Sequence, residues 1–469
     1  MRHESVWLAT AQPPRFGSVT GTEDVDVVVV GAGITGLTTA LLAARDGARV
    51  AVVEVARIAS GTSGRTTGKV TSQHGLVYAR LAREHGADRA RLYAEANQRG
   101  VETVAFLAAD LGIDCELRRA AAYCYAEGDD ARRPVMEEAA AARRLGLPAA
   151  MAEVTELPFA VAAAVRFDDQ VLLHPGRYLA GLARSASAAG VRIFEDSRVT
   201  ELHERGGGVE VTTPAGRVRA ERAVVATLLP IKAIGGFFAR ARPTRAYGLA
   251  ARLRTPAPRG MYLAASGPSR SLRPWPGAGP NGLIAVGESH TTGEEPRTEG
   301  RYEALEAWLF QLDNHWMESL DYRWSAQDYT TVDSVPYVGR SAAARPHAGG
   351  DGVRQVGPQR RHRGRAHARR PHRRPRQPMA GAVRRAAGRG CARGRTAAEG
   401  ERPRGRPVAR RPAGPPATGR PRAPRPGRGR RRRGGRARGG RVPPPRRAGG
   451  GGVGGVQPHG VRRALERGR

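Results

Sequence analysis

The sequence is poor in cysteine, and this scarcity excludes several kinds of site. Cys115, Cys124 and Cys391 lie far apart and form neither a CxxC motif nor a disulfide framework. Residues 1–23 lack the apolar run of a signal peptide. The apolar stretch 25–44 is broken by glycines and threonines, so it does not predict a membrane span. We therefore expect a cytoplasmic protein without a membrane segment, in which Cys115 and Cys124 lie on or beside strands and serve packing.

The last 129 residues lack six residue types altogether. Residues 341–469 contain no Phe, Tyr, Trp, Ile, Asn or Lys, and one leucine, Leu465. A segment so poor in apolar residues cannot bury a hydrophobic core. It carries 38 arginines against four acidic residues, whereas residues 1–340 balance 40 basic residues against 39 acidic ones. The formal charge of +35 therefore belongs to the tail, and the first 340 residues have the composition of an ordinary globular protein.

The most informative stretch follows the first 23 residues. Residues 25–30 are valines apart from Asp26, which is typical of a strand buried on both faces of a parallel sheet. A glycine turn, a helix to about Asp46 and a second strand at residues 50–53 come next. A G-x-G-x-x-G turn in this setting predicts a dinucleotide-binding unit, and an ordinary βαβ unit with a glycine turn is the alternative.

Each position of this unit has a physical role. Gly31 permits the tight turn, Gly33 lets the backbone approach a diphosphate, and Gly36 lets the helix pack closely on the strand. The diphosphate would lie at the positive helix N-terminus. Glu54 ends the second strand, where its carboxylate can accept hydrogen bonds from a ribose. Residues 60–75 form a long Gly/Ser/Thr loop at the same edge of the sheet, which predicts ligand contact rather than a solvated connection.

The rest of the first 340 residues alternates between helices and strands. Residues 77–147 predict helices and residues 177–188 another, whereas residues 191–227 predict a return to the nucleotide-binding sheet. Residues 245–325 predict further strands and one helix. The expected fold is α/β (α+β overall), a Rossmann-like domain with an inserted sheet-based substrate domain. The predicted boundaries are an N-terminal extension at 1–23, nucleotide-binding segments at about 24–80, 170–230 and 325–340, substrate-domain segments at about 81–169 and 231–324, and the low-complexity tail at 341–469.

Four further motifs narrow the family. They are SGTSGRTTGKVTSQHGL at residues 60–76, LLHPGRYLAGLA at 172–183, SLR at 271–273 and DSVPYVGR at 333–340. With the glycine turn, they resemble the FAD-dependent oxidoreductases of the D-amino-acid-oxidase type, which include glycine, sarcosine and glutamylputrescine oxidases. The combination is most similar to the branch that carries a Rieske [2Fe-2S] domain after the flavin domain. One departure is Arg65, at a position where that branch more often has His.

The resemblance implies FAD as the cofactor and a small amine or amino acid as the substrate. The implied reaction is hydride transfer to the flavin from a carbon beside an amine nitrogen, and the protein orients the cofactor that performs it. The electron acceptor stays open. The substrate-side candidates are His74, His174, Arg273 and His290, each of which has a structural role as its alternative. The residues implied to hold FAD are Gly31, Gly33, Ile34, Thr35, Gly36, Glu54, Ser63, Gly64, Arg65, Thr66, Thr67, Lys69, Val199, Ala226 and Thr227.

Residues 341–469 leave three interpretations open. They could form a disordered Arg/Pro/Gly-rich tail, a tail that binds nucleic acid non-specifically through phosphates but has no aromatic residues for base stacking, or an out-of-frame product. The genetic code favours the third. After a shift of one base, residues 348–363 allow the closing strand and glycine turn of the flavin fold, residues 377–384 the segment that follows it, and residues 442–446 a Cys-x-His-x-Gly loop of a Rieske cluster. These matches share one shift and the family's order, and they indicate a frameshift near residues 341–347.

A shifted frame has a functional consequence. In the fold that the chain resembles, a strand and a helix after Gly339 place the helix N-terminus at the flavin edge where negative charge grows on reduction. The printed sequence offers neither, and it has no Cys-x-His pair for an iron–sulfur cluster, so we assign no metal ligand. We expect the chain as written to bind FAD weakly or to fold incompletely. The alternative function is nucleic-acid or anion binding through the arginine tail.

Overall fold

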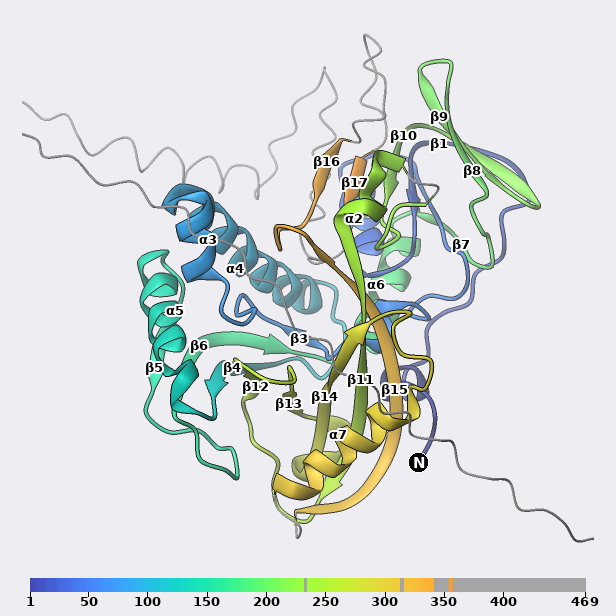
Figure 1. The fold of residues 1–469 in the computed structure, drawn as a ribbon. Helices are drawn as coiled ribbons and strands as arrows, with labels where there is room; N and C mark the ends of the chain where they lie inside the picture. The colour runs from blue at the N-terminus through green and yellow to red at the C-terminus, as the bar shows by residue number, and fades with distance from the viewer. Residues whose placement is uncertain (232–233, 313–315, 341–353, 357–469) are drawn as a thin grey trace, which may run out of the picture. The chain divides into compact units, whose positions relative to one another are not determined.

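Two β-sheets organise the part of the chain that the computed structural model describes, which is residues 1–231, 234–312, 316–340 and 354–356. Among these residues, the first sheet has eight strands, in the order β16-β17-β10-β1-β2-β7 with the hairpin β8–β9 attached to β10, and the second sheet has nine. Figure 1 shows the first sheet at the upper right and the second sheet below it. Helices pack on both sheets, so the predicted mixed α/β fold is confirmed.

The first sheet is parallel at its centre, as the valine run predicts. Its central strand β1 pairs with β2 on one side and with β10 on the other, and β7 extends the sheet beyond β2. The predicted return of residues 191–227 to this sheet is therefore confirmed. The strands are β1 (Gly21–Val30), β2 (Val50–Val53), β7 (Arg192–Phe194), β8 (Glu201–Arg205), β9 (Gly208–Thr213), β10 (Gly216–Val225), β16 (Val338–Arg340) and β17 (Arg354–Val356).

Strand β1 is buried on both faces because its valines alternate between two cores. Val27 and Val29 belong to a core with the helices α2 (Ile34–Arg45) and α6 (Pro175–Ala188). Val28 and Val30 belong to a separate core on the other side of the sheet. Fully burying such a side chain stabilises the fold by about 1.5–3 kcal/mol, so this strand fixes the sheet to which the glycine turn is attached.

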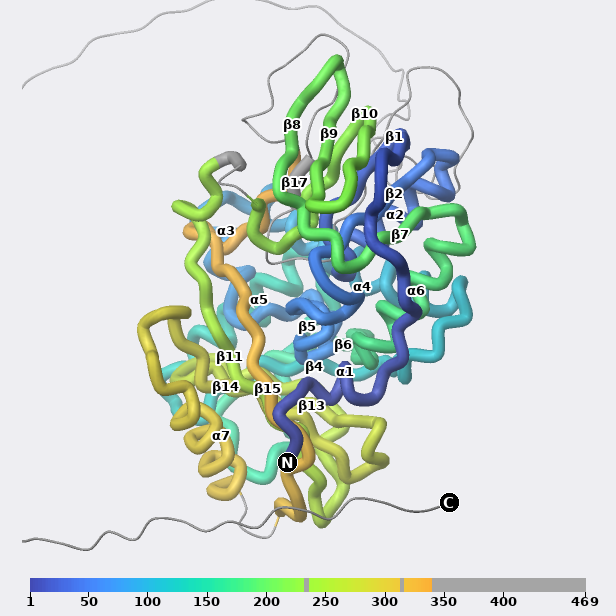
Figure 2. The backbone as a smooth tube through the Cα atoms, turned by 90° about the vertical axis from the view of Figure 1, so that its right-hand side faces the viewer, coloured from blue at the N-terminus to red at the C-terminus, as the bar shows by residue number. Residues whose placement is uncertain are grey.

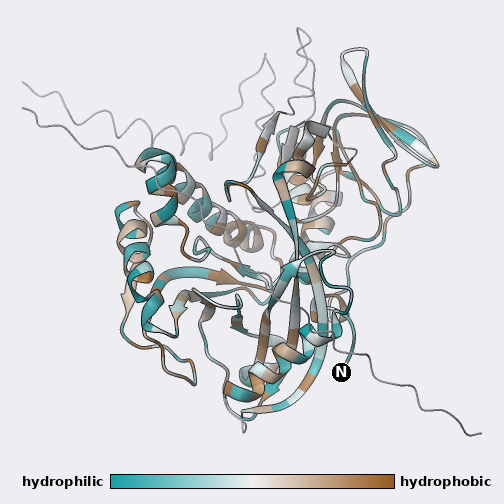
Figure 3. Cartoon of the chain, in the orientation of Figure 1, coloured by the Kyte–Doolittle hydropathy of each residue, from teal (hydrophilic) through white to brown (hydrophobic). Residues whose placement is uncertain are grey.

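The second sheet is mostly antiparallel and also carries apolar residues on both faces. On β4, Cys124 faces a core with α3 (Tyr78–His85) and α5 (Arg132–Arg144), whereas Tyr125 faces a core with α7 (Glu299–Leu312). Figure 3 shows both hydrophilic and hydrophobic colours on α3 and α5, as expected for helices with one face in solvent. The strand order is β15 (Met317–Thr331), β11 (Ala241–Leu253), β14 (Gly282–Thr291), β13 (Ser271–Pro274), β12 (Met261–Ala264), β4 (Arg118–Ala126), β6 (Ala163–Leu172) and β3 (Lys69–Val70), with β5 (Ala149–Ala152) on β6.

Two local predictions need correction. The expected helical stretch 77–147 contains α3, α4 (Ala87–Asp110) and α5, but β4 interrupts it, and Cys124 lies on this strand as predicted. β4 is rich in alanine, yet its pairing with β6 and the burial of Cys124, Tyr125 and Ala126 on the two faces of the sheet override that helical preference. The expected loop 60–75 contains a short 3-10 helix η1 (Thr62–Arg65) and strand β3, which joins the second sheet. Further 3-10 turns are η2 (Asp129–Ala131), η3 (Ile234–Arg240) and η4 (Pro276–Asn281).

The expectation that no strand follows Gly339 is wrong. Strand β17 pairs in parallel with β10 and antiparallel with β16, and so extends the first sheet. The backbone groups at the edge of β10, at Val224 and Val225, can pair with any extended segment, whatever its side chains. The predicted absence of a following helix and of iron–sulfur ligands concerns residues outside those that the structure describes.

The N-terminal segment is part of the fold and not a polar extension. Its short helix α1 (Val6–Ala9) buries Val6 and Trp7 in a core with Trp275, Ile284 and Trp324 of the second sheet. Further along, Val19 belongs to a core of the first sheet. Figure 2 shows this segment in dark blue, running from the second sheet past α6 to β1. Two isolated apolar residues give no periodic pattern, so sequence reasoning missed this role.

Candidate dinucleotide-binding site

A cavity of about 360 Å³ lies at the carboxyl ends of β1, β2 and β10, where the glycine turn leaves the first sheet. Ligands bind at this edge in open parallel sheets. Its lining comes from segments far apart in the sequence: the glycine turn, the residues after β2, the residues after β7 and those after β10. Of the predicted cofactor residues, the lining contains Gly31, Gly33, Ile34, Thr35, Glu54, Ser63, Val199, Ala226 and Thr227.

The turn from β1 into α2 brings backbone atoms close together. Gly31 has a φ of +104°, and a Cβ at this position would lie 2.8 Å from the carbonyl oxygen of Ala226. A Cβ on Gly36 would lie 1.9 Å from the carbonyl oxygen of Gly31. A side chain at Gly31 would push the turn away from Ala226, and one at Gly36 would push α2 away from the turn, so this geometry requires glycine at both positions.

The N-terminus of α2 is suited to an anion. The helix begins after Gly33, which makes no side-chain cap, and its first turn contains no acidic residue. The N–H of Ile34 donates to Ser63 Oγ at 3.3 Å, which is a long hydrogen bond. Because the helix end carries a partial positive charge, a phosphate placed here would be a stronger acceptor for these N–H groups than the hydroxyl.

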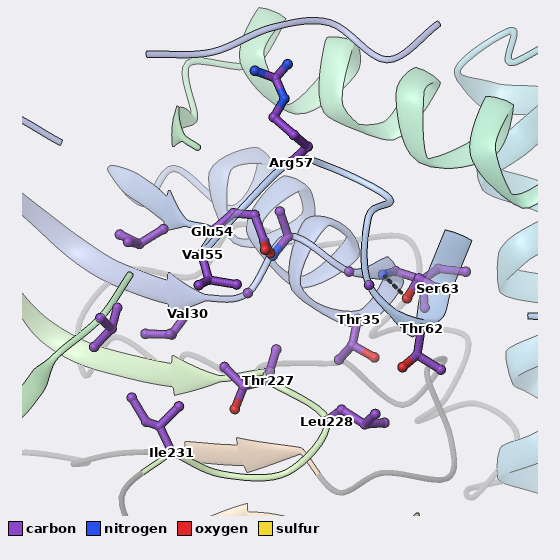
Figure 4. A pocket seen from close by; sticks show the side chains of 18 of the residues that line it. Val30, Thr35, Glu54, Val55, Arg57, Thr62, Ser63, Thr227, Leu228 and Ile231 are labelled. Carbon is purple, nitrogen blue, oxygen red and sulfur yellow. Dashed lines mark hydrogen bonds between the residues drawn. The ribbon is translucent and has the colours of Figure 1, made fainter. Parts of the chain in front are cut away.

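Glu54 is held in place at the end of β2 by backbone donors. Its Oε2 accepts a hydrogen bond from Ala32 N at 2.7 Å, and its Oε1 accepts one from Ala56 N at 3.1 Å. Each carboxylate oxygen keeps a lone pair that can accept a hydroxyl proton. Figure 4 shows Glu54 beside the turn, with Thr227 and Ile231 on the facing side.

These features fit a dinucleotide. The helix N-terminus offers N–H donors and positive charge to a diphosphate, and Glu54 offers ordered acceptors to a ribose. Gly31 and Gly33 line the cavity, and neither carries a side chain that a ligand would have to avoid. The sequence alone does not explain how Glu54 is ordered, because its two donors come from backbone that folds around it.

Six predicted cofactor residues do not line this cavity. Gly36 packs against the strand, and Gly64 lies against the carbonyl oxygen of Ala59. Arg65 is half-buried, and this burial lowers the pKa of its guanidinium. Thr66 and Thr67 follow directly, and their carbonyl oxygens accept hydrogen bonds from Trp7 and Arg273. The sixth residue, Lys69, lies on β3 in the second sheet.

Lys69 makes its contacts inside the second sheet. Its Nζ donates to the carbonyl oxygen of Tyr262 at 3.0 Å and contacts Ser271 Oγ. Burial, together with the nearby charge of Arg273, lowers the pKa of Lys69 to about 7. A lysine in this setting is partly neutral near neutral pH, so it is a weaker anion ligand than its sequence position suggests.

Two of the four substrate-side candidates are buried in structural contacts. His174 caps α6: its Nδ1 accepts from Arg177 N at 3.2 Å, and its Nε2 lies 2.8 Å from Thr10 Oγ1. Burial and the charge of Arg177 lower the pKa of His174 to about 4, which keeps it neutral. Arg273 is 1% exposed, and its guanidinium donates to the carbonyl oxygens of Thr67, Leu173 and Pro274. Burial lowers the pKa of Arg273 to about 9.

The other two candidates lie apart from these. His74 is exposed, and its ring lies edge-on to Tyr93 at a centroid distance of 6.5 Å. His290 is on β14, and its Nε2 lies 2.9 Å from the Tyr247 hydroxyl. The described cavity lining contains neither of them, nor His174 or Arg273. The structure therefore does not bring the four candidates together with the nucleotide cavity.

A buried ion pair at the cavity wall escaped the sequence reasoning. Arg57 lines the cavity, and its guanidinium lies 2.9 Å from the carboxylate of Glu195, which is fully buried. Glu195 also accepts from Ile58 N at 2.7 Å and from Phe16 N at 2.9 Å. The sequence does contain a signal for this residue: Glu195 directly follows β7, just as Glu54 directly follows β2. Arg198 and Ser197 of the same turn also line the cavity.

The cysteines behave as packing residues. Cys115 and Cys124 are free and buried, and burial raises the pKa values of their thiols to about 11 and about 12. A thiol that stays protonated is a poor nucleophile and a poor metal ligand. Within the described residues, no group of three or more His, Cys, Asp or Glu is arranged to hold a metal ion.

The profile of a protein family described as FAD dependent oxidoreductase matches residues 26–362. The chain belongs to this family. The putative Rieske 2Fe-2S iron-sulfur protein YhfW of Bacillus subtilis (strain 168) is 31% identical over 338 residues, which cover 72% of this chain and 66% of that protein. Gamma-glutamylputrescine oxidoreductase of Escherichia coli (strain K12) is 29% identical over 213 residues, which cover 43% of this chain and 48% of that protein. The fold is similar to that of glycine oxidase from Geobacillus kaustophilus, with a TM-score of 0.59 and 19% sequence identity. The similar region covers 72% of this chain and 90% of the glycine oxidase chain.

Family membership bears out the predicted resemblance. FAD is the cofactor in the family's description, and the fold is that of amino-acid oxidases. The chain spans between about half and two thirds of the length of the curated relatives that it matches. None of the helices in the described part of the chain has the length and apolar character needed to cross a bilayer.

Proposed function

We propose that the chain binds FAD in the cavity at the glycine turn and oxidises a small amine or amino acid. The observation that carries this proposal is the cavity itself, where a helix N-terminus without a capping side chain at Gly33 and an ordered carboxylate occur together. When bound, FAD supplies an acceptor for a hydride from a carbon beside an amine nitrogen. Relatives named for gamma-glutamylputrescine and glycine support the substrate class.

The proposed roles follow from the geometry of the cavity. The N–H groups at the start of α2 would hold the diphosphate, with Gly33 allowing its close approach. Glu54 would accept hydrogen bonds from the ribose of the adenosine half. Val199 would meet the adenine through its backbone, and Ala226 and Thr227 would lie beside the cofactor.

The flavin half would extend along the residues that follow the cavity wall. Thr62 and Ser63 line the cavity, and the chain continues from them into residues 64–69. His74 and His290 remain candidates on the substrate side, whereas the contacts of His174 and Arg273 favour positioning roles. Catalytic acid and base groups are therefore left unassigned.

The visible spectrum of the purified full chain tests the cofactor. We expect flavin absorbance, release of FAD on denaturation, and bleaching when an amine or amino acid such as glycine, sarcosine or gamma-glutamylputrescine is added without oxygen. We expect Glu54→Gln to raise the Kd for FAD about tenfold, because one backbone donor loses its charged acceptor. The matched control is Glu204→Gln on the exposed face of the hairpin, which should leave the Kd unchanged. Absence of FAD binding would refute the proposal.

The predicted weakness of FAD binding concerns residues beyond β17. We propose that the printed chain holds FAD less tightly than a chain with the family's closing helix, because no helix N-terminus of the predicted kind is encoded there. A full, tightly held complement of FAD in the purified chain would contradict this.

Nucleic-acid binding is the second candidate function, favoured by 38 arginines in residues 341–469. This segment lies outside the described residues apart from β17. Non-specific binding through phosphates should weaken steeply with salt. We would compare RNA binding by the full chain with that of a chain ended after Arg340, over a series of salt concentrations. Equal binding by both chains would rule out the tail as the binding element.

A further inference from the structure

Five consecutive backbone carbonyls in the loop after the cavity wall each accept a hydrogen bond from a residue outside the loop. The carbonyls belong to residues 64–68, which follow Thr62 and Ser63 of the cavity lining. The bonds run from Ser5 Oγ to Gly64 O at 2.7 Å, from Trp324 Nε1 to Arg65 O at 3.0 Å, from Trp7 Nε1 to Thr66 O at 2.7 Å, from Arg273 Nη1 to Thr67 O at 3.1 Å, and from Leu173 N to Gly68 O at 3.1 Å.

The four donor side chains are buried. Ser5 is 1% exposed, Trp7 is fully buried, Trp324 is 5% exposed and Arg273 is 1% exposed. Trp7 lies at the centre, since the guanidinium of Arg273 stacks over its ring at 5.2 Å and Trp324 belongs to the same apolar core. A buried carbonyl that loses its donor is left unsatisfied, which is costly, so each donor restrains the loop strongly.

The donors come from segments that are distant in the sequence. Ser5 and Trp7 lie in the N-terminal segment, Leu173 follows β6, Arg273 lies on β13 and Trp324 on β15. Nothing within the loop itself makes these bonds. Its conformation is therefore imposed by the second sheet and the N-terminal segment, and it is set before any ligand arrives.

The captured carbonyls also orient the rest of each peptide. In a planar trans peptide, the N–H points away from the C=O of the same unit. Each carbonyl drawn toward its donor therefore directs the N–H of the next residue away from that donor. Backbone N–H groups fixed in this way are typical of sites that hold anionic or electron-rich groups, because they need no reorganisation when the ligand binds.

We propose that Trp7, Trp324 and Arg273 are positioning residues that hold residues 64–68 as a preformed cradle for the flavin half of the cofactor. This inference rests on the proposed function and adds the element that shapes the site beyond the ADP half. It assigns the N-terminal segment to the cofactor site, although that segment does not line the cavity.

The test uses the full chain with Trp7→Phe and Trp324→Phe. Each change keeps an aromatic ring in the core and removes the indole N–H that donates to the loop. The matched control is Trp275→Phe, because Trp275 is 3% exposed in the same core but donates no hydrogen bond to the loop among the described residues. Any general effect of shrinking a buried tryptophan therefore appears in all three variants.

Two readouts separate this inference from the proposed function. Amide hydrogen exchange without FAD should be about tenfold faster or more in residues 64–68 of both loop variants, with residues 27–30 of β1 unchanged and with Trp275→Phe like the wild type. FAD titration should show a Kd raised about tenfold in the loop variants and less than twofold in the control, with loss of fine structure in the flavin band.

The outcomes are distinct. Unchanged loop exchange in Trp7→Phe and Trp324→Phe would overturn the anchoring, whether or not FAD binds. Faster exchange with an unchanged Kd for FAD would overturn the cradle and leave the proposed function standing. If the wild-type chain binds no FAD, the proposed function is refuted, and so is the assignment of FAD to residues 64–68. The anchoring of the loop would still stand if both loop variants show the expected faster hydrogen exchange.

Discussion

At the residue scale, the structure separates groups that the sequence places in one class. Glu54 and His174 are both polar residues at the end of an element, but Glu54 faces the cavity and His174 faces inward. His174 is neutral because it is buried: a protonated ring at this position would be a cation without its hydration shell. Its hydrogen bond to Arg177 N caps α6, so the side chain contributes to stability in a pH-dependent way.

This pH dependence is testable. The folded-state pKa of His174 is about 4, below the ordinary value of about 6.5, so between these pH values the unfolded chain binds a proton that the folded chain does not. Stability should therefore fall as pH is lowered through this window, by up to about 3 kcal/mol from this residue. His174→Asn keeps a helix-capping acceptor but does not titrate, so denaturant unfolding at pH 7 and pH 4.5 should show a smaller loss.

The reference is the wild-type chain, unfolded at the same two pH values. An equal loss of stability in the His174→Asn variant would contradict the assignment of a buried neutral imidazole.

At the element scale, α2 shows why the spacing of the glycine turn is fixed. Helix propensity alone favours alanine over glycine inside a helix. Gly36 violates that preference because a Cβ there would meet the carbonyl oxygen of Gly31 at 1.9 Å. The cost of a clash with the backbone exceeds the gain in helix propensity, so the close contact with Gly31 requires glycine at position 36.

We expect Gly36→Ala to lower the free energy of unfolding by about 1–3 kcal/mol and to weaken FAD binding, because α2 must shift away from β1. Gly300→Ala in α7 is the control, since a Cβ there meets nothing within 4 Å. It should leave stability unchanged or raise it by up to about 1 kcal/mol. Urea unfolding followed by circular dichroism measures both, and equal effects at the two positions would argue against the clash.

At the scale of the whole molecule, the chain divides by composition. The first 340 residues build two sheets with balanced charge, and the residues beyond add β17 to the first sheet at its edge. The match to the FAD dependent oxidoreductases ends at residue 362, inside the arginine-rich segment. We propose that a shifted reading frame near residues 341–347 causes this change of composition.

Resequencing the gene across codons 335–360 tests this reading. We expect a one-nucleotide insertion or deletion near codons 341–347, and the restored frame should encode a closing strand, a glycine turn and a helix. The restored protein should bind FAD more tightly than the printed chain, as judged by titration. An intact frame through this stretch would contradict the interpretation.

The sequence by itself determined the nucleotide-binding unit and the family. Strand, turn, helix and Glu54 lie within 34 consecutive residues, and their pattern depends on local turn geometry and on burial of the valine run. The limits of local reasoning show at β4, where pairing with β6 overrode a helix-like composition.

Only the tertiary structure decided how residues 64–68 are held. Their carbonyls are fixed by Trp7, Arg273 and Trp324, which come from three segments far from the loop in sequence. Such contacts follow from the packing of the second sheet and the N-terminal segment, and no periodicity in the sequence encodes them. The physical reason is that hydrogen bonds between distant segments depend on the whole fold, whereas a glycine turn depends on its neighbours.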